Sequence, residues 1–388
     1  MIAFGHFHAE TLPAALASGR DALLRGLSLP SLTIRVGDDS VTYVLSSTGF
    51  EIRPGQAEAD ISVTLSEDDW SGLVGDVETV PGILYGDRLL DHSGNVMDFV
   101  RWDPILRALY TGRPLYDPQA HQLVDRRGGA LDPLLSFTLD NDAAAMREFL
   151  DAAGYLLVKS VFSVAELTEF RSAARDLAVQ ARQGDQRSWW GKDQDGHAVL
   201  SRCLNAGEQR AFRGLYDDPR IAQLAALLPD GMRHPAAEEQ DGVTVVFKQP
   251  GVAEGLSDLP WHRDCGMGGH ANMCPCYVLS IYLHDATEAQ GPLQFLPGSQ
   301  DYALGFADAR DVDYACAVTV PARAGDVTLH IGDVMHAAPP PEAGQQDYRQ
   351  SVLLSYHPDF ENHRGERHYN DALLGDEQGQ VRNLKTFA

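Results

Sequence analysis

Apolar residues recur along this chain with a helical spacing in some segments and as short runs in others. From Met146 to Ala153 they repeat at helical spacing, and Gly154 follows as a helix stop. The apolar run YLLV comes next and predicts a strand. Ser163, with Glu166 three residues later, forms the signature of a capping box at the start of a second helix.

From about residue 242 the pattern changes to short segments rich in β-branched and apolar residues. GVTVVFK, CYVLSIYL, GPLQFLP, AVTVPA, DVTLH and SVLLSYH each predict a strand, with turn residues between them. Such a series predicts a jelly-roll, or double-stranded β-helix, with the preceding helices packed outside it. In contrast, residues 184–197, GDQRSWWGKDQDGH, are rich in Gly and Asp and predict a loop.

The first part of the chain predicts a small α+β layer. LTIRVGDDSVTYVLSSTGFEIRPG and ADISVTLS are typical of strands, and two helices follow, the first with Ser66 as its N-cap. Near residues 117–140, Pro, Gly and charged residues mix without a clear period, which is typical of a boundary. We therefore predict an α+β protein with an N-terminal domain at 1–120, a linker at 121–140 and a β-helix domain at 141–388.

His262, Asp264 and His336 are candidate metal ligands. In a strand, side chains at i and i+2 share a face, so His262 and Asp264 can hold one ion while Arg263 points away. A distant strand can supply the third ligand across the mouth of a barrel. Two imidazoles and one carboxylate on one side of an iron are typical of non-haem Fe(II) oxygenases.

Three polar residues are candidates for binding a carboxylated cosubstrate. Arg349 stands at the start of a predicted strand, and its planar guanidinium can make two parallel bonds to a carboxylate. Ser351 shares its strand face and can add a third bond. Lys248, before a Gln-Pro-Gly turn, can add positive charge, although a solvated lysine is the simpler interpretation.

Aromatic residues are the candidates for substrate contact. Trp261 adjoins His262 and either packs at the pocket wall or touches substrate. Trp189 and Trp190 lie in the predicted loop, where paired aromatics would suit a substrate lid.

Several segments resemble, in the same order, those of phytanoyl-CoA dioxygenase-like Fe(II)/2-oxoglutarate oxygenases. They are FKQPG, WHRD, GPLQFLPGSQ, GDVTLH, His336 and Arg349, within roughly residues 140–388. The resemblance implies that His262, Asp264 and His336 bind Fe(II) and that Arg349 binds the far carboxylate of 2-oxoglutarate. It places the distal ligand at His336 rather than at His330, which lies on the same face if the strand is regular. O2 is then the oxidant, and succinate and CO2 are released.

The chain departs from the family pattern at two positions. It has Gln300 where family members usually have histidine, and Ala338 where they often have serine. Neither position ligates iron. Halogenating relatives replace the ligand carboxylate with a small residue, so Asp264 favours hydroxylation, although desaturation, epimerisation or ring formation would use the same residues.

The N-terminal part resembles the sterol-carrier-protein-like lipid-binding fold. ADISVTLS, SEDDW, ILYGDRLLDHSGN and the helix at 95–110 carry this resemblance, over about residues 10–118. It implies an apolar tunnel that holds a ligand or a substrate tail. The alternative is a module for packing or dimerisation that binds nothing.

Charge and composition limit the partners. Lys plus Arg number 31 against 55 Asp plus Glu, a net charge of −24, so the surface should repel nucleic acid and anionic membranes. The sequence starts without a signal-peptide pattern and contains no long apolar run, which predicts a soluble, cytoplasmic protein. The five cysteines lack paired CxxC spacing and are interpreted as reduced thiols.

These patterns predict an enzyme that hydroxylates a small, partly apolar metabolite, lipid-like or from secondary metabolism. Two alternatives stay open, a lipid carrier whose barrel is inactive and a cupin-like metal isomerase. Arg349 argues against the isomerase, which needs no buried site for a carboxylate. The oligomeric state is not encoded in a recognisable pattern.

Overall fold

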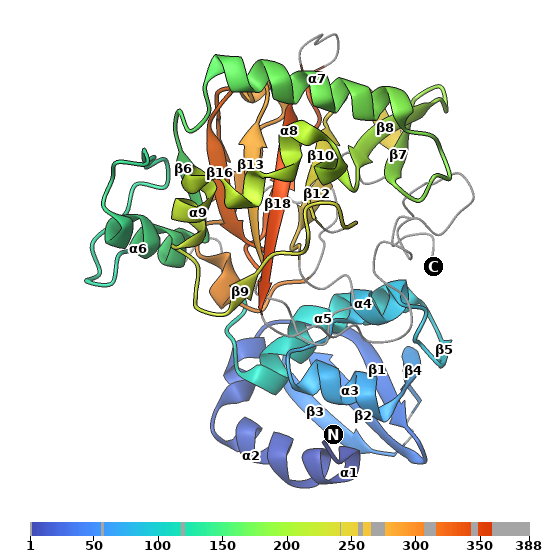
Figure 1. Cartoon of the computed structure of the whole chain (residues 1–388). Coiled ribbons are helices and arrows are strands. Elements are labelled where there is room, and N and C mark those ends of the chain that lie inside the picture. Colours follow the sequence, from blue (N-terminus) through green and yellow to red (C-terminus); the bar gives the residue numbers. More distant parts are fainter. Residues whose placement is uncertain are drawn as a thin grey trace.

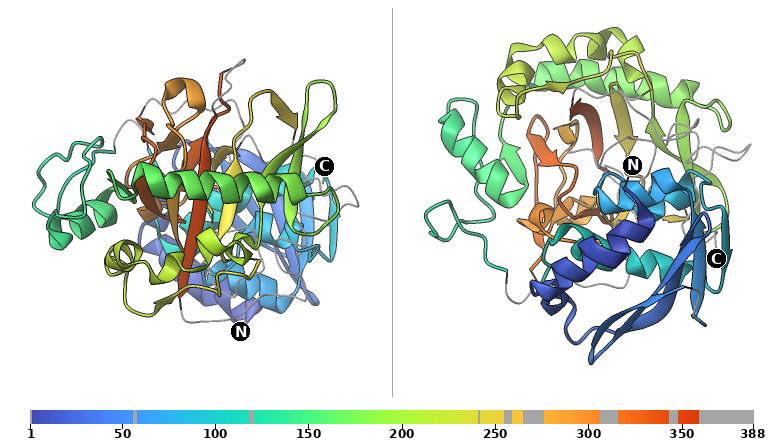
Figure 2. Two further views of the ribbon diagram at one scale, coloured as in Figure 1. Left: turned by 45° about the horizontal axis from the view of Figure 1, so that its top comes forward. Right: turned by 90° about the horizontal axis from the view of Figure 1, so that it is seen from below.

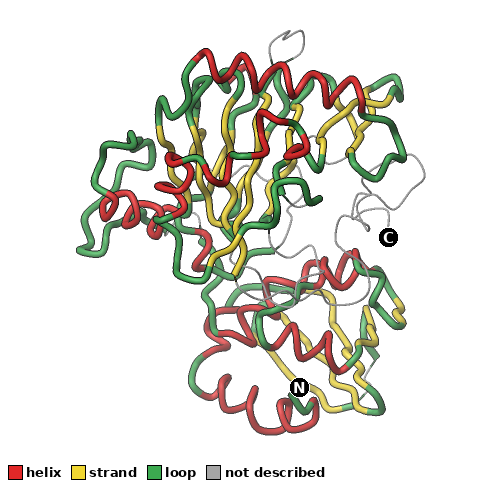
Figure 3. The backbone as a smooth tube through the Cα atoms, viewed as in Figure 1, coloured by secondary structure: helices red, strands yellow, loops and turns green. Residues whose placement is uncertain are grey.

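The computed structural model describes residues 2–55, 58–117, 121–240, 242–254, 259–264, 276–305, 316–342 and 348–358. Figure 1 shows an N-terminal part in blue and cyan below a larger C-terminal part, with separate sheets that stand out as yellow strands in Figure 3. Each part has its own hydrophobic core. In the described ranges, we find no helix with both the length and the apolar character needed to cross a membrane.

The N-terminal sheet has five strands in the order β3-β2-β1-β4-β5. Strands β1 and β4 are parallel and the other neighbours antiparallel. The strands are β1 (Leu29–Val36), β2 (Asp39–Ser46), β3 (Gly49–Pro54), β4 (Ile61–Leu65) and β5 (Asp91–Ser93). The helical elements are α1 (Phe4–His6), a π-helical turn (Phe7–Thr11), α2 (Leu12–Ala17), a 3-10 turn (Arg20–Leu24), α3 (Glu67–Val74), α4 (Val80–Tyr85) and α5 (Val96–Thr111).

Large aromatic side chains fill the interior of the N-terminal part. Tyr43, Trp70, Phe99 and Trp102 are fully buried in one cluster, contributed by the sheet and by helices α3 and α5. Aromatic residues of this size bury a large apolar area each and dominate the energetics of a core. This core fixes α5 against the sheet, and α5 faces the C-terminal part in Figure 1.

The described residues of the C-terminal part form two antiparallel sheets. The larger runs in the order β11-β7-β8-β10-β18-β13-β16-β6, with β9 paired to β18, and the smaller runs β12-β17-β14-β15. The larger sheet comprises β6 (Tyr155–Val158), β7 (Ser188–Asp193), β8 (Ala198–Cys203), β9 (Met232–Arg233), β10 (Thr244–Phe247), β11 (Val252–Glu254), β13 (Tyr277–Tyr282), β16 (Val327–Ile331) and β18 (Gln350–Pro358). The smaller comprises β12 (Leu259–His262), β14 (Leu293–Phe295), β15 (Val318–Val320) and β17 (His336–Ala338).

Helices cover the outside of the larger sheet, as predicted. The long helix α7 lies across it in Figure 2 (left), and residues of both share one core. The helices are α6 (Ala143–Ala153), α7 (Val164–Gln180), α8 (Arg210–Arg213) and α9 (Pro219–Ala225), with 3-10 turns at Ala206–Glu208, Leu215–Asp217, Glu288–Gln290 and Ser299–Asp301. The arrangement is a mixed helix and sheet fold whose antiparallel sheets are compatible with the predicted jelly-roll core.

The predicted helix boundaries are confirmed by their capping groups. The Ser66 side chain accepts a hydrogen bond from the Asp69 N–H, and Ser163 and Glu166 form the predicted capping box. Gly154 follows α6 in the left-handed region with a φ of 84°, a conformation that glycine adopts without steric cost. The domain boundary at residues 121–140 stays a prediction.

The prediction of a loop at residues 184–197 was wrong. Residues 188–192 pair with residues 198–203, so β7 and β8 form a hairpin. The Gly- and Asp-rich composition accounts only for its turn, in which the Asp193 N–H donates to the His197 carbonyl. Aromatic residues favour strands, and in Ser-Trp-Trp this preference outweighs the polar residues on either side.

Candidate metal centre

The structure brings His262, Asp264 and His336 together, although they come from two separate stretches of sequence. His262 ends β12 and pairs directly with His336 of β17. The Nε2 atoms of the two histidines lie 3.6 Å and 3.7 Å from Asp264 Oδ1. One ligand atom from each residue lies within 4.8 Å of the others, which is the spacing that a shared metal ion requires.

His330 contacts the other oxygen of the same carboxylate. Its Nε2 lies 2.9 Å from Asp264 Oδ2. The regular strand that would place His330 and His336 on one face is not present, because a turn at residues 331–334 separates β16 from β17, and the two strands belong to different sheets. His330 is therefore placed to orient Asp264, as hydrogen-bond partners of metal ligands generally do.

The protonation states of two candidate ligands suit a divalent metal. Burial by itself would raise the pKa of Asp264, but His336, His262 and His330 outweigh it and hold that pKa well below its usual range. Burial and, to a smaller extent, the neighbouring His262 lower the pKa of His336 to about 3, although the charge of Asp264 opposes them. At neutral pH the site thus contains a carboxylate and a neutral imidazole, the forms that bind metal.

The three residues line a cavity of about 90 Å³ between the two sheets. This volume is several times the roughly 10–15 Å³ that one water molecule needs on the same measure. Apolar side chains from both sheets line much of it, namely Val246, Val278, Leu293, Ala338 and Leu353. Of the two departures from the family pattern, Ala338 thus lines the cavity, whereas the Gln300 amide donates to the Asp151 carbonyl at 3.0 Å and serves packing.

Arg349 is a buried cation in this cavity. It is 4% exposed, and its Nε and Nη1 have no hydrogen-bond partner among the residues that the structure describes. Burial lowers the pKa of Arg349, and nearby Tyr282 only partly opposes this. An unpaired buried charge is costly, so a site of this kind fits an anionic ligand.

Ser351 and Lys248 line the same cavity as Arg349. Lys248 is 1% exposed, so the interpretation of a solvated lysine was wrong. Its backbone N–H donates to the Arg349 carbonyl at 2.9 Å, so the two residues pair just beyond the ends of the adjacent strands β10 and β18. The orphaned nitrogens of Arg349, with a hydroxyl and a second cation nearby, fit a carboxylate of 2-oxoglutarate.

Of the three tryptophans predicted to contact substrate, Trp189 is among the cavity-lining residues and the other two are not. The Trp190 indole N–H donates to the Ser188 hydroxyl at 2.8 Å and the ring packs against the core. Trp261 packs with Leu296, Met335 and Ala337. Successive side chains of a strand point to opposite faces, which separates Trp189 from Trp190.

Sequence reasoning missed Arg202, which also lines the cavity. Its guanidinium lies 4.7 Å from the centre of the Trp189 ring, and its Nε and Nη2 donate to the Thr244 hydroxyl at 3.2 Å and 3.0 Å. No described carboxylate pairs with it. Strand β8 has no clear alternation of apolar and polar residues, so no sequence signal distinguished this arginine from a surface residue.

The described cysteines are consistent with the prediction that the cysteines are reduced thiols. Among the described residues, Cys203 and Cys316 are free thiols, and Cys276 forms no disulfide with either of them. Cys265 and Cys274 lie outside the described residues.

A family model described as "Phytanoyl-CoA dioxygenase (PhyH)" matches residues 150–346, just over half of the 388 residues. No curated protein matches the chain. The match begins after the N-terminal part, so the resemblance of that part to sterol carrier proteins stays a prediction.

Solved structures give similar but weaker matches. AviO1 from Streptomyces viridochromogenes Tue57 is 25% identical, with 56% of this chain and 95% of that chain covered and a TM-score of 0.43. The epimerase SnoN in complex with Fe3+, alpha ketoglutarate and nogalamycin RO is 23% identical, with 56% and 83% covered and a TM-score of 0.43. EctD from S. alaskensis with bound Fe is 23% identical, with 59% and 82% covered and a TM-score of 0.45. TM-scores below 0.5 are too low to support an inference about fold or reaction.

Proposed function

Because the chain belongs to the phytanoyl-CoA dioxygenase family, we propose that it hydroxylates an unactivated C–H bond of a small, partly apolar metabolite. The family confirms the general class predicted from the sequence, an Fe(II)/2-oxoglutarate-dependent oxygenase, and with it the cofactors Fe(II), 2-oxoglutarate and O2. The observation that carries the proposal is one cavity lined both by His262, Asp264 and His336 and by the buried, unpaired guanidinium of Arg349.

In this proposal His262, Asp264 and His336 would hold Fe(II), since two imidazoles and one carboxylate are the ligand set typical of non-haem Fe(II) oxygenases. When bound, Fe(II) and 2-oxoglutarate would supply the chemistry by which O2 oxidises the substrate, with release of succinate and CO2. His330 keeps Asp264 in position through Oδ2, so that Oδ1 faces the two histidines.

Arg349 and Ser351 bind the far carboxylate of 2-oxoglutarate in this proposal. Arg349 offers a planar pair of donors, and burial strengthens each charge-assisted bond because water does not compete. Lys248 adds a second positive charge beside it. The remaining carboxylate of 2-oxoglutarate would be left to bind the metal, so both ends of the cosubstrate would be used.

The rest of the cavity indicates the character of the substrate. Its apolar lining suits a hydrocarbon portion. Arg202 lies on β8, and Ser351 lies on β18, two strands further along the sheet. Because neighbouring strands are about 4.8 Å apart, these two strands are about 10 Å apart. Both carboxylates of 2-oxoglutarate are already bound, and Arg202 therefore fits an anionic group on the substrate itself. A partly apolar carboxylate is the substrate class that this lining favours.

The test is succinate release from 2-oxoglutarate under air, by full-length protein reconstituted with Fe(II) without oxygen. His262→Ala and Arg349→Ala should each abolish the turnover. Arg126→Ala is a matched control, because Arg126 forms an exposed ion pair with Asp151 on the surface. Turnover that survives both site variants contradicts the proposal.

Uncoupled turnover without substrate can be slow, so binding of Fe(II) and of 2-oxoglutarate is measured in parallel. Binding of neither would favour the inactive carrier. Binding of metal without 2-oxoglutarate would favour the cupin-like isomerase.

A further inference from the structure

Arg263 stands between two candidate ligands and points away from them. Its side chain is 1% exposed and forms an ion pair with Asp333. Its Nη2 also lies 3.9 Å from Oδ2 of Asp103, a buried residue of α5 in the N-terminal part. Through Arg263, the segment that carries His262 and Asp264 is thus paired with two carboxylates, Asp333 and Asp103. Asp103 belongs to the N-terminal part.

Asp333 joins three arginines from different segments. Besides Arg263, the Nη2 of Arg107 lies 2.9 Å from Asp333 Oδ2, and the Nη1 of Arg113 lies 3.6 Å from the same oxygen. Arg107 lies in α5 and is 6% exposed, and its Nε donates to Asp76 at 2.7 Å. Asp333 is therefore fixed by helix α5 and by the segment that follows it.

The turn that contains Asp333 also carries the metal site. The preceding residue, Gly332, accepts a hydrogen bond from the Asp264 N–H at 2.8 Å. His336 follows Asp333 by three residues and begins β17. Both segments that supply ligands therefore meet at this turn.

Other hydrogen bonds join the N-terminal and C-terminal parts at this junction. The Arg113 Nη1 donates to the Gln300 carbonyl at 2.9 Å, and the Ala303 N–H donates to the Pro114 carbonyl at 2.8 Å. Ala303 is itself buried in the N-terminal core. The charged residues thus work within a packed interface.

We propose that the N-terminal part is a positioning element of the metal centre, acting through Arg107, Asp333 and Arg263. This inference rests on the proposed function, since it takes His262, Asp264 and His336 as the ligands. Removing one member of a buried ion pair leaves an uncompensated charge, which the protein relieves by moving the segment or admitting water. Because Asp333 and Arg263 adjoin the ligands, that movement displaces them, and metal sites are sensitive to displacements of about 0.5 Å.

The experiment measures metal binding by the full-length Arg107→Gln variant. Arg107 pairs with Asp76 and Asp333, and of these two Asp333 lies in the turn that adjoins the ligands, so a change in affinity is expected to pass through Asp333. We expect Mn(II) and, without oxygen, Fe(II) to bind about tenfold more weakly than to the wild type, the lower end of what residues behind metal ligands usually contribute. The visible absorption band of the Fe(II)/2-oxoglutarate complex should shift or broaden as well.

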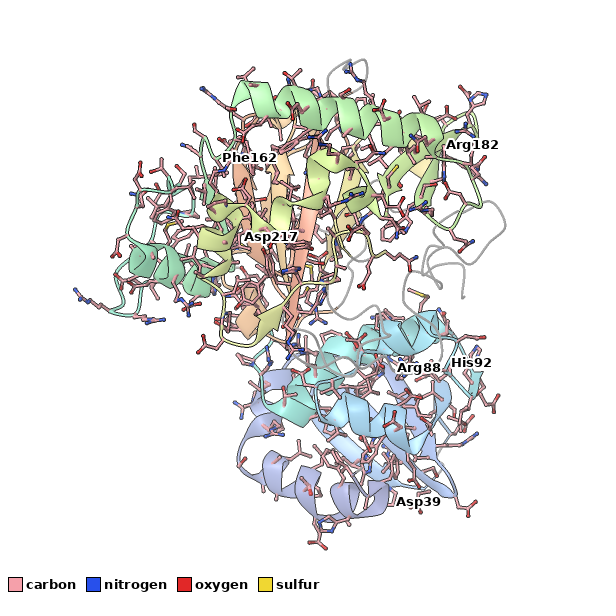
Figure 4. All side chains as sticks on the ribbon, viewed as in Figure 1. Asp39, Arg88, His92, Phe162, Arg182 and Asp217 are labelled. Carbon is pink, nitrogen blue, oxygen red and sulfur yellow. The ribbon has the colours of Figure 1, made fainter. Side chains whose placement is uncertain are left out.

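Arg88→Gln is the matched control. Arg88, labelled in Figure 4, is a largely buried arginine of the N-terminal part that pairs with Asp69 and Glu78 but not with Asp333. It should lower the melting temperature without changing the metal affinity. Equal weakening in both variants, or wild-type affinity in Arg107→Gln, would overturn the inference.

A second variant covers the case in which Arg107→Gln does not fold. Arg263→Lys keeps the charge but not the planar pair of donors, and it should bind metal more weakly while staying folded. Wild-type affinity in that folded variant also contradicts the inference. If the wild type itself binds no metal, the proposed function fails first and this inference fails with it.

Discussion

The carboxylate of Asp333 pairs with Arg107 across 226 positions of sequence, with Oδ2 and Nη2 2.9 Å apart. Burial alone would raise the pKa of Asp333, but the charges of Arg263 and Arg107 outweigh it and hold that pKa below its usual value. The pair therefore stabilises the fold only while Asp333 is ionised.

The sign of this shift gives a prediction for pH. The folded pKa lies below the unfolded value of about 3.9, so the contribution is fully present above that value. It is lost as the pH falls through the folded pKa. We expect Asp333→Asn to lower the free energy of unfolding by about 3–5 kcal/mol at pH 7, the usual effect of removing one partner of a buried pair.

Urea unfolding of both proteins, followed by tryptophan fluorescence from pH 7 down to pH 3, measures this difference. The difference in the free energy of unfolding between wild type and Asp333→Asn should become smaller below about pH 4. Asp151→Asn, which removes an exposed partner of Arg126, should change the free energy by less than about 1 kcal/mol throughout. A gap that stays constant with pH would show that Asp333 acts without its charge.

Variants of His330 and His336 distinguish a ligand from a residue that orients a ligand. His336→Ala should abolish Fe(II) binding, because it removes a ligand atom. His330→Ala should weaken it about 10–100-fold, since it frees Asp264 Oδ2. His330→Gln can still donate a hydrogen bond and should recover most of the affinity. Calorimetry without oxygen measures all three, and complete loss in His330→Gln would instead make His330 a ligand.

Arg349 should determine affinity for 2-oxoglutarate but not for metal. Each charge-assisted hydrogen bond contributes about 1.5–3 kcal/mol, and 1.4 kcal/mol corresponds to a tenfold change. We therefore expect Arg349→Gln to raise the KM for 2-oxoglutarate about 10–100-fold, and Arg349→Lys to raise it less. Steady-state succinate release and a parallel Fe(II) titration separate the two effects. Weaker Fe(II) binding in Arg349→Lys would indicate a general disturbance of the cavity.

Arg202 should act on substrate and not on 2-oxoglutarate. We expect the KM of Arg202→Gln for 2-oxoglutarate to stay within about twofold of the wild-type value, because the Arg202 guanidinium binds the anionic group of the substrate in this proposal. Decanoate and decanamide differ only in the anionic group, and their effect on uncoupled succinate release measures the preference. The wild type should bind decanoate at least about tenfold more tightly, and Arg202→Gln should lose that preference. A rise in the KM for 2-oxoglutarate would make Arg202 a cosubstrate residue.

The sequence by itself determined the features that depend on neighbours in the chain. Capping of α7 by Ser163 and Glu166 needs a spacing of three residues. His262 and Asp264 were predicted to share a strand face, but β12 ends at His262, and Asp264 reaches the same site from the bend that follows. The strands of the β-core followed in the same way from local composition. The family pattern then indicated His336, which the structure places opposite His262.

Only the tertiary structure decided which charged residues are buried together. Four of them look like surface residues in the sequence, because a charge carries no local sign of its partner: Arg107 and Arg263, which are buried, and Arg202 and Asp333, which are half-buried. Burial becomes tolerable when a distant residue supplies the opposite charge or an aromatic face, and folding alone creates that proximity. For the same reason, the turn that separates His330 from His336 and the hairpin of β7 and β8 depended on pairing with distant strands, which local spacing does not encode.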